Sequence, residues 1–109
     1  MKVIKRDGTE VPFDEEKIIK AIRSANSDVA ENDRLSEDDA GFLVQTIRFQ
    51  CESLGRAVSI EEIQDMVEER LMKRNPSIAK RYIIYREWRN VERDRRSSIK
   101  SVMDGIVTV

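Results

Sequence analysis

The chain has 109 residues, 39% of them hydrophobic and 38% charged, with a net charge of −1. This length predicts one domain with one modest core, and no segment approaches the roughly 18 apolar residues of a membrane span. There is no histidine and one cysteine, Cys51, which excludes an internal disulfide and a Cys-rich zinc site and removes the commonest general base. We expect Cys51 in the core, with a reactive thiol as the alternative. We expect a cytoplasmic protein, because the N-terminus has no apolar signal segment.

A β-hairpin is expected at the N-terminus. Residues 1–4 form a short, largely apolar stretch, and residues 9–13 form a second candidate strand. Between them lies Asp7-Gly8, a strong tight-turn signal because glycine accepts positive φ. A two-stranded hairpin is only marginally stable alone, so it should pack against another part of the fold.

Four helices should follow the hairpin, each with a local start signal and apolar residues at helical spacing. The predicted N-terminal caps are short polar side chains, at Asp14, Ser36, Ser59 and Asn75. Glu62 completes a capping box with Ser59, and Pro76 occupies the first position of the last helix, where its missing N–H is harmless. Gly55 should end the second helix, and residues 56–58 could be a short strand or an extended linker.

The predicted fold class is mainly α (α+β), a four-helix bundle covered by a small N-terminal β-hairpin or sheet. We expect residues 1–92 to form this domain. The apolar rhythm fades after Asp94, so residues 93–109 should be a basic linker or tail that leads toward a further domain or partner.

Charge is distributed unevenly along the chain. Residues 28–72 carry twelve acidic and four basic side chains, whereas residues 80–100 carry eight basic and three acidic ones. The basic segment could meet a nucleotide phosphate, a nucleic acid or the acidic middle of its own fold.

The hairpin turn is the first candidate site. Lys5 and Arg6 precede a turn that can present free backbone amides, and cations together with amides suit phosphate oxygens. Lys17 lies in the first turn of the first helix, where a cation is unfavourable unless an anion binds there too. The alternative is a solvated hairpin tip and a surface lysine.

The last helix is the second candidate site. Arg86 and Arg89 lie three residues apart and share a face, so together with the hairpin lysine they could clamp a triphosphate. The alternative is a salt-bridged helix flank whose aromatic residues, Tyr82 and Tyr85, lie in the core. The sequence contains no Walker loop and no nucleophile with a base. We therefore assign no catalytic and no metal-ligating residue, and expect a sensor.

Two blocks of the sequence resemble the ATP-cone family. The run Val3-Ile4-Lys5-Arg6-Asp7-Gly8, with Phe13 and Lys17-Ile18 after it, is similar to the N-terminal signature of that family. The run from Ile78 to Arg86, with Arg89 beyond it, is similar to the family's last-helix pattern. The blocks occur in the right order and together span roughly residues 1–92.

The resemblance implies a small domain that binds ATP or dATP and controls the overall activity of a ribonucleotide reductase. The chain looks most like the N-terminal regulatory domain of the anaerobic (class III) ribonucleoside-triphosphate reductase. Phosphate contacts would come chiefly from the hairpin and first helix, and base contacts from the start of the third helix. The nucleotide-binding residues expected from the two candidate sites and the resemblance are Val3, Lys5, Arg6, Gly8, Lys17, Ile60, Arg86 and Arg89. Val11 stands where some family members have glutamate, which bears on the ribose or metal contacts and on how ATP is distinguished from dATP.

The expected partners follow from the same resemblance. They are an adenine nucleotide, with Mg²⁺ to offset its charge, a reductase catalytic domain or subunit, and a second copy in a nucleotide-dependent homo-oligomer. No membrane is expected, and nucleic acid is not the expected partner. The alternative function is a nucleotide-responsive repressor of ribonucleotide reductase genes that binds DNA through residues 86–100. That repressor carries a four-cysteine zinc ribbon in front of its cone, and this chain does not.

Overall fold

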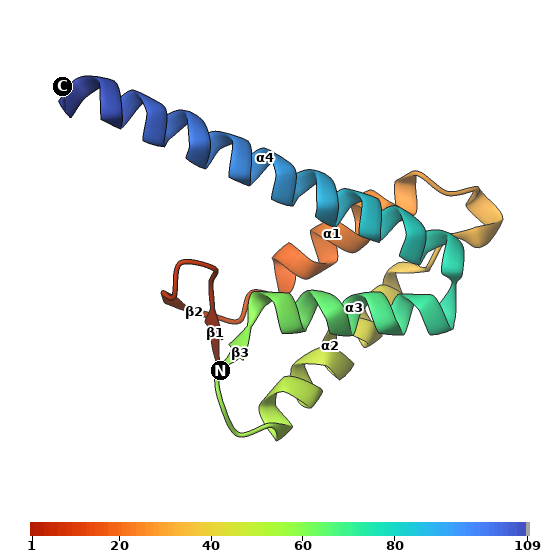
Figure 1. The fold of residues 1–109 in the computed structure, drawn as a ribbon. Coiled ribbons are helices and arrows are strands. Elements are labelled where there is room, and N and C mark those ends of the chain that lie inside the picture. Colours follow the sequence, from red (N-terminus) through yellow and green to blue (C-terminus); the bar gives the residue numbers. More distant parts are fainter. Residues whose placement is uncertain (109) are drawn as a thin grey trace.

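The computed structural model describes the backbone of residues 1–108 and the side chains of residues 1–95 (Figure 1). The elements in chain order are β1 (Lys2–Ile4), β2 (Glu10–Pro12), α1 (Glu15–Ser27), the 3₁₀ turn η1 (Glu31–Asp33), α2 (Glu37–Ser53), β3 (Val58–Ser59), α3 (Ile60–Arg74) and α4 (Pro76–Thr108). The predicted fold class, a mainly α domain with a small sheet, is confirmed.

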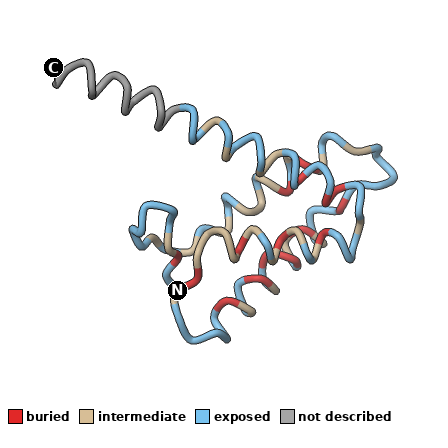
Figure 2. Tube along the Cα trace, in the orientation of Figure 1, coloured by how far each residue is buried: buried red, intermediate tan, exposed pale blue. Residues whose placement is uncertain are grey.

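The four helices enclose one apolar core. α4 packs against α1 and α3, and α2 packs against the same two helices. Figure 2 shows the buried positions recurring along the helices, while the loops are mostly exposed. The largest fully buried side chains include Ile22 of α1, Ile47 of α2, Leu71 of α3 and Ile78 of α4. Cys51 is also fully buried, as expected for a core residue.

Side-chain caps fix where the four helices begin, and before α4 the Asn75 side-chain oxygen accepts from the Ser77 amide at 3.0 Å. The Asp14 carboxylate accepts from the Glu16 amide, and the Ser36 hydroxyl accepts from the Asp39 amide. Ser59 and Glu62 satisfy each other's backbone amides, so the predicted capping box is confirmed. These signals are local in the sequence, which is why the predicted helix starts match the structure.

The sheet has three strands, in the order β2-β1-β3. β1 pairs antiparallel with β2, where Val3 faces Val11, and parallel with β3, where Val3 faces Val58. Val3 and Val58 are both buried, so the sheet closes one end of the bundle's core. Of the two predicted alternatives for residues 56–58, the short strand is observed only in part, because β3 begins at Val58 and residues 56–57 form the connection to it.

α4 continues beyond the point where the apolar rhythm fades, and Figure 1 shows it as the longest helix. The backbone of residues 93–108, expected to be a linker, is helical; residue 109 and the side chains beyond residue 95 lie outside the described part. The sequence has no proline after Pro76, and residues such as arginine, lysine and methionine favour helix without any packing. The domain boundary at residue 92 stays a prediction. No helix in the described range is both long and apolar enough to cross a membrane.

Candidate functional site

The hairpin turn between β1 and β2 holds Lys5, Arg6 and Gly8, and all three residues are exposed. The Lys5 amide donates to the Thr9 carbonyl at 2.8 Å, and the Gly8 amide donates to the Lys5 carbonyl at 3.0 Å. Gly8 has φ +88°, the left-handed conformation that favours glycine. The Thr9 amide donates to the Asp7 carboxylate. Several turn amides therefore bond within the turn, so the expected row of free amides is only partly present, and the exposed cations are the main feature for an anion.

The junction between β3 and α3 brings the start of α3 beside the hairpin. Ser59, the last residue of β3, pairs with Ile4 of β1. Ile60 follows as the first residue of α3 and packs, half-buried, against the core. Glu61, the next residue, reaches the hairpin turn. The parallel pairing of two strands that are far apart in sequence thus decides which α3 side chains meet Arg6.

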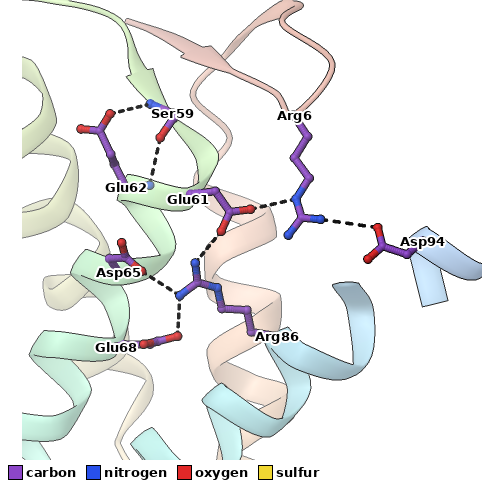
Figure 3. A network of polar contacts seen from close by, with 8 residues as sticks. All are labelled: Arg6, Ser59, Glu61, Glu62, Asp65, Glu68, Arg86 and Asp94. Carbon is purple, nitrogen blue, oxygen red and sulfur yellow. Dashed lines mark hydrogen bonds and ion pairs between the residues drawn. The ribbon is translucent and has the colours of Figure 1, made fainter. Parts of the chain in front are cut away.

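One carboxylate joins the hairpin to the last helix (Figure 3). Glu61 Oε1 accepts from Arg6 Nε at 2.8 Å, and Glu61 Oε2 accepts from Arg86 Nη2 at 2.6 Å. Arg6 Nη1 also lies 3.8 Å from Asp94 Oδ1 on α4. The hydrogen bonds from Arg86 and Arg6 hold the pKa of Glu61 below its usual range, against the opposing effect of burial. Two arginines from different elements therefore converge on one anionic group.

Arg86 is enclosed more tightly than Arg6. Its side chain is 15% exposed, and its Nη1 lies 2.9 Å from Asp65 Oδ1 and 2.5 Å from Glu68 Oε1, both on α3. Burial acts to lower the pKa of Arg86, but the hydrogen bonds to Glu68, Asp65 and Glu61 outweigh it and raise that pKa. Arg86 therefore adopts the salt-bridged arrangement that was the alternative for this helix, with Tyr82 buried in the core.

The remaining predicted site residues lie in three different environments. Val3 is buried at the centre of the sheet. Lys17, in the first turn of α1, is exposed. Arg89 is exposed one turn beyond Arg86, so these two arginines do not share surroundings despite their spacing. The structure connects Arg6 and Arg86 through a shared partner; it records no such connection for Lys17 or Arg89 among the described side chains.

Sequence reasoning missed the acidic half of this cluster. The missed residues are Glu61, Asp65, Glu68 and Asp94. The first three recur at helical spacing within the acidic segment 28–72, and they meet a basic helix, so the suggestion that the basic segment faces the acidic middle of its own fold is confirmed for Arg86. The helical spacing of these acidic residues was the sequence signal from which an acidic face on α3 could have been predicted.

Other parts of the described surface do not coincide with the predicted site. A hollow of about 270 Å³ lies between α2 and α3 and is lined by residues such as Phe42, Leu43 and Arg70. None of the eight predicted residues lines it. Among the described side chains, no group of three or more histidine, cysteine or acidic residues is arranged to hold a metal ion.

Comparison with known proteins agrees with this architecture. Residues 1–91 match the family model of the ATP cone domain. The chain belongs to the ATP-cone family. The match covers the hairpin, the sheet, the first three helices and the part of α4 that packs in the bundle. Membership of this family supports a nucleotide-binding regulatory role for the domain.

Relatives of this ATP-cone chain are ribonucleotide reductases of different classes. The anaerobic ribonucleoside-triphosphate reductases of Haemophilus influenzae and Escherichia coli are 32% and 38% identical, each over 96% of this chain and over 15% and 14% of their own length. The vitamin B12-dependent ribonucleoside-diphosphate reductase of Thermoplasma acidophilum is 39% identical over 87% of this chain and 13% of its own length. The chain therefore spans only about a seventh of the reductases it matches.

Proposed function

We propose that this ATP-cone chain is the nucleotide sensor of a ribonucleotide reductase, binding ATP or dATP at the hairpin end of the bundle and setting the overall activity of the enzyme. The observation that carries the proposal is the convergence of Arg6 and Arg86 on one anionic group beside the hairpin. Guanidinium groups bind phosphate through paired hydrogen bonds, so two of them make an effective subsite for a polyphosphate.

The other proposed contacts surround this pair. Lys5 and Gly8 lie in the same turn as Arg6, and Val3 forms the strand that leads into it. Ile60 offers an apolar, half-buried surface next to the turn, which suits the base of a nucleotide. Lys17 and Arg89 are exposed cations on α1 and α4 that would reach phosphate only after side-chain movement.

The domain is proposed to regulate and not to catalyse. We assign no protein ligand to Mg²⁺; the ion would bind to the triphosphate oxygens, which match its preference for hard oxygen ligands. Regulation requires that ATP and dATP differ in affinity for two states of the reductase, because a ligand with equal affinity for both shifts nothing. We propose that these states differ in how the domain contacts a reductase catalytic region or a second copy, in the cytoplasm.

Thermal melting of the chain with and without millimolar ATP, dATP or CTP, each with Mg²⁺, tests the proposal. A ligand at about 100 times its dissociation constant should add about 2.7 kcal/mol, which is several degrees for a domain of this size. The melting temperature should rise with ATP or dATP and stay unchanged with CTP. Equal melting temperatures with and without every nucleotide would contradict it.

A further inference from the structure

Glu61 is bound in the way that a ligand phosphate would be. Each of its two carboxylate oxygens accepts from a different arginine, Arg6 on the hairpin at 2.8 Å and Arg86 on α4 at 2.6 Å (Figure 3). A phosphate group also presents several oxygens to arginine side chains. The same two donors cannot serve Glu61 and a phosphate at once.

Resting on the proposed function, we propose that Glu61 is an internal competitor for nucleotide: its carboxylate occupies the anion position between Arg6 and Arg86, and a phosphate binds by replacing it on Arg6. Glu61 thereby lowers the affinity of the sensor for nucleotide, because it competes with the phosphate and makes no attractive contact with the nucleotide.

The two arginines differ in how easily they can change partner. If Glu61 withdraws, Arg86 keeps Asp65 at 2.9 Å and Glu68 at 2.5 Å, so its guanidinium stays in place. Among the ion pairs of the described side chains, Arg6 would keep the one with Asp94, whose Oδ1 lies 3.8 Å away. Arg86 is therefore the fixed donor of this subsite, and Arg6 is the donor that exchanges a carboxylate for a phosphate.

Exposure makes this exchange feasible. The side chains of Arg6 and Glu61 are 35% and 43% exposed, and ion pairs in such surroundings contribute little to stability. A triphosphate carries more charge than one carboxylate and can replace such a pair. The hydrogen bonds from Arg86 and Arg6 also lower the pKa of Glu61, so the competing group is ionised at neutral pH.

The exchange would also change a contact outside the bundle. Arg6 bridges from the hairpin to Asp94, which lies on α4 after the last core residue of that helix and is 75% exposed. When Arg6 turns to a phosphate, Asp94 loses its hairpin partner. The ligand is thus linked to the distal part of α4 by one side chain.

The test is calorimetric titration of the whole chain with ATP and, separately, with inorganic tripolyphosphate. Three proteins are compared: the unmodified chain, Glu61→Gln, and Glu69→Gln as a control. Glu69 lies on the same helix, pairs with Lys73 and gives the same change of net charge. Glu61→Gln should bind both ligands about 1.5- to fivefold more tightly, the range expected from removing one exposed ion pair. Glu69→Gln should bind like the unmodified chain.

Equal affinity for Glu61→Gln and Glu69→Gln, or weaker binding by Glu61→Gln, would overturn the competitor role while leaving the nucleotide site intact. Absence of ATP binding in all three proteins would instead overturn the proposed function, and the inference with it. Should Glu61→Gln fail to fold by circular dichroism, Glu61→Ala removes the same carboxylate from Arg6 and Arg86, and unchanged affinity in that variant would overturn the competition.

Discussion

Arg86 and Glu68 face each other across the interface between α4 and α3, with Arg86 Nη1 2.5 Å from Glu68 Oε1. Their side chains are only 15% and 26% exposed, so this contact belongs to the packed part of the molecule. Arg86 therefore has a structural task, pairing with the acidic face of α3, in addition to its proposed place beside a phosphate.

Replacing Arg86 should destabilise the chain without any ligand. Arg86→Gln removes the positive charge among Glu61, Asp65 and Glu68 and leaves three carboxylates close together, which should lower the free energy of unfolding by about 1–3 kcal/mol. Urea unfolding followed by circular dichroism measures this. Arg81→Gln, at an exposed position of the same helix, should change stability by less than about 0.5 kcal/mol. Equal losses in both variants would mean that the Arg86 cluster contributes nothing specific.

Acid should weaken the fold partly through Glu61. Its pKa in the folded chain lies below the ordinary value of 4.5, because Arg86 and Arg6 hydrogen-bond to the ionised form. A lowered folded pKa means that the stabilisation is complete above the unfolded value and is lost as pH falls through the folded one. Glu61→Gln should therefore lose less stability than the unmodified chain between about pH 6 and about pH 3. Urea midpoints at both pH values provide the comparison, and parallel losses in the two proteins would count against this assignment.

Cys51 should react slowly in the folded chain. Its thiol is fully buried, its Sγ lies 3.7 Å from the Met66 sulfur, and burial raises its pKa. Because the thiolate is the reactive form, an aromatic disulfide reagent should label the native protein far more slowly than the urea-unfolded protein. A Ser53→Cys variant places a second thiol at an exposed position two residues away, and in the native protein this thiol should react much faster than Cys51. Rapid labelling of native Cys51 would show that the core opens there.

The helices could be predicted from sequence because their boundaries are encoded locally. Ser59 and Glu62 lie three residues apart, and the capping box they form depends on nothing else in the fold. β3 was harder to predict, because two residues become a strand only through parallel pairing with β1, more than fifty residues earlier. The helical course of residues 93–108 was missed because the prediction relied on apolar spacing, which helix propensity does not require.

The candidate site divides in the same way. The turn at Gly8 and the cations before it could be recognised from adjacent residues. The partners of Arg6 could not, because Glu61 and Asp94 reach it from two other helices. The acidic spacing on α3 indicates a charged face, but only the packing of α3 on α4 decides that Arg86 lies against it.

The central claim is that the hairpin end of this ATP-cone domain binds an adenine nucleoside triphosphate. Calorimetric titration of the chain with ATP and dATP, repeated with Lys5→Ala and Arg6→Ala, tests this claim most directly. Lys73→Ala, at the far end of α3, is the control cation. We predict that the unmodified chain and the control bind nucleotide. In each hairpin variant the binding free energy should weaken by about 1–3 kcal/mol, with little change in the melting temperature of the free protein. Hairpin variants that bind as tightly as the unmodified chain, or that lose as much stability as binding, would contradict the account.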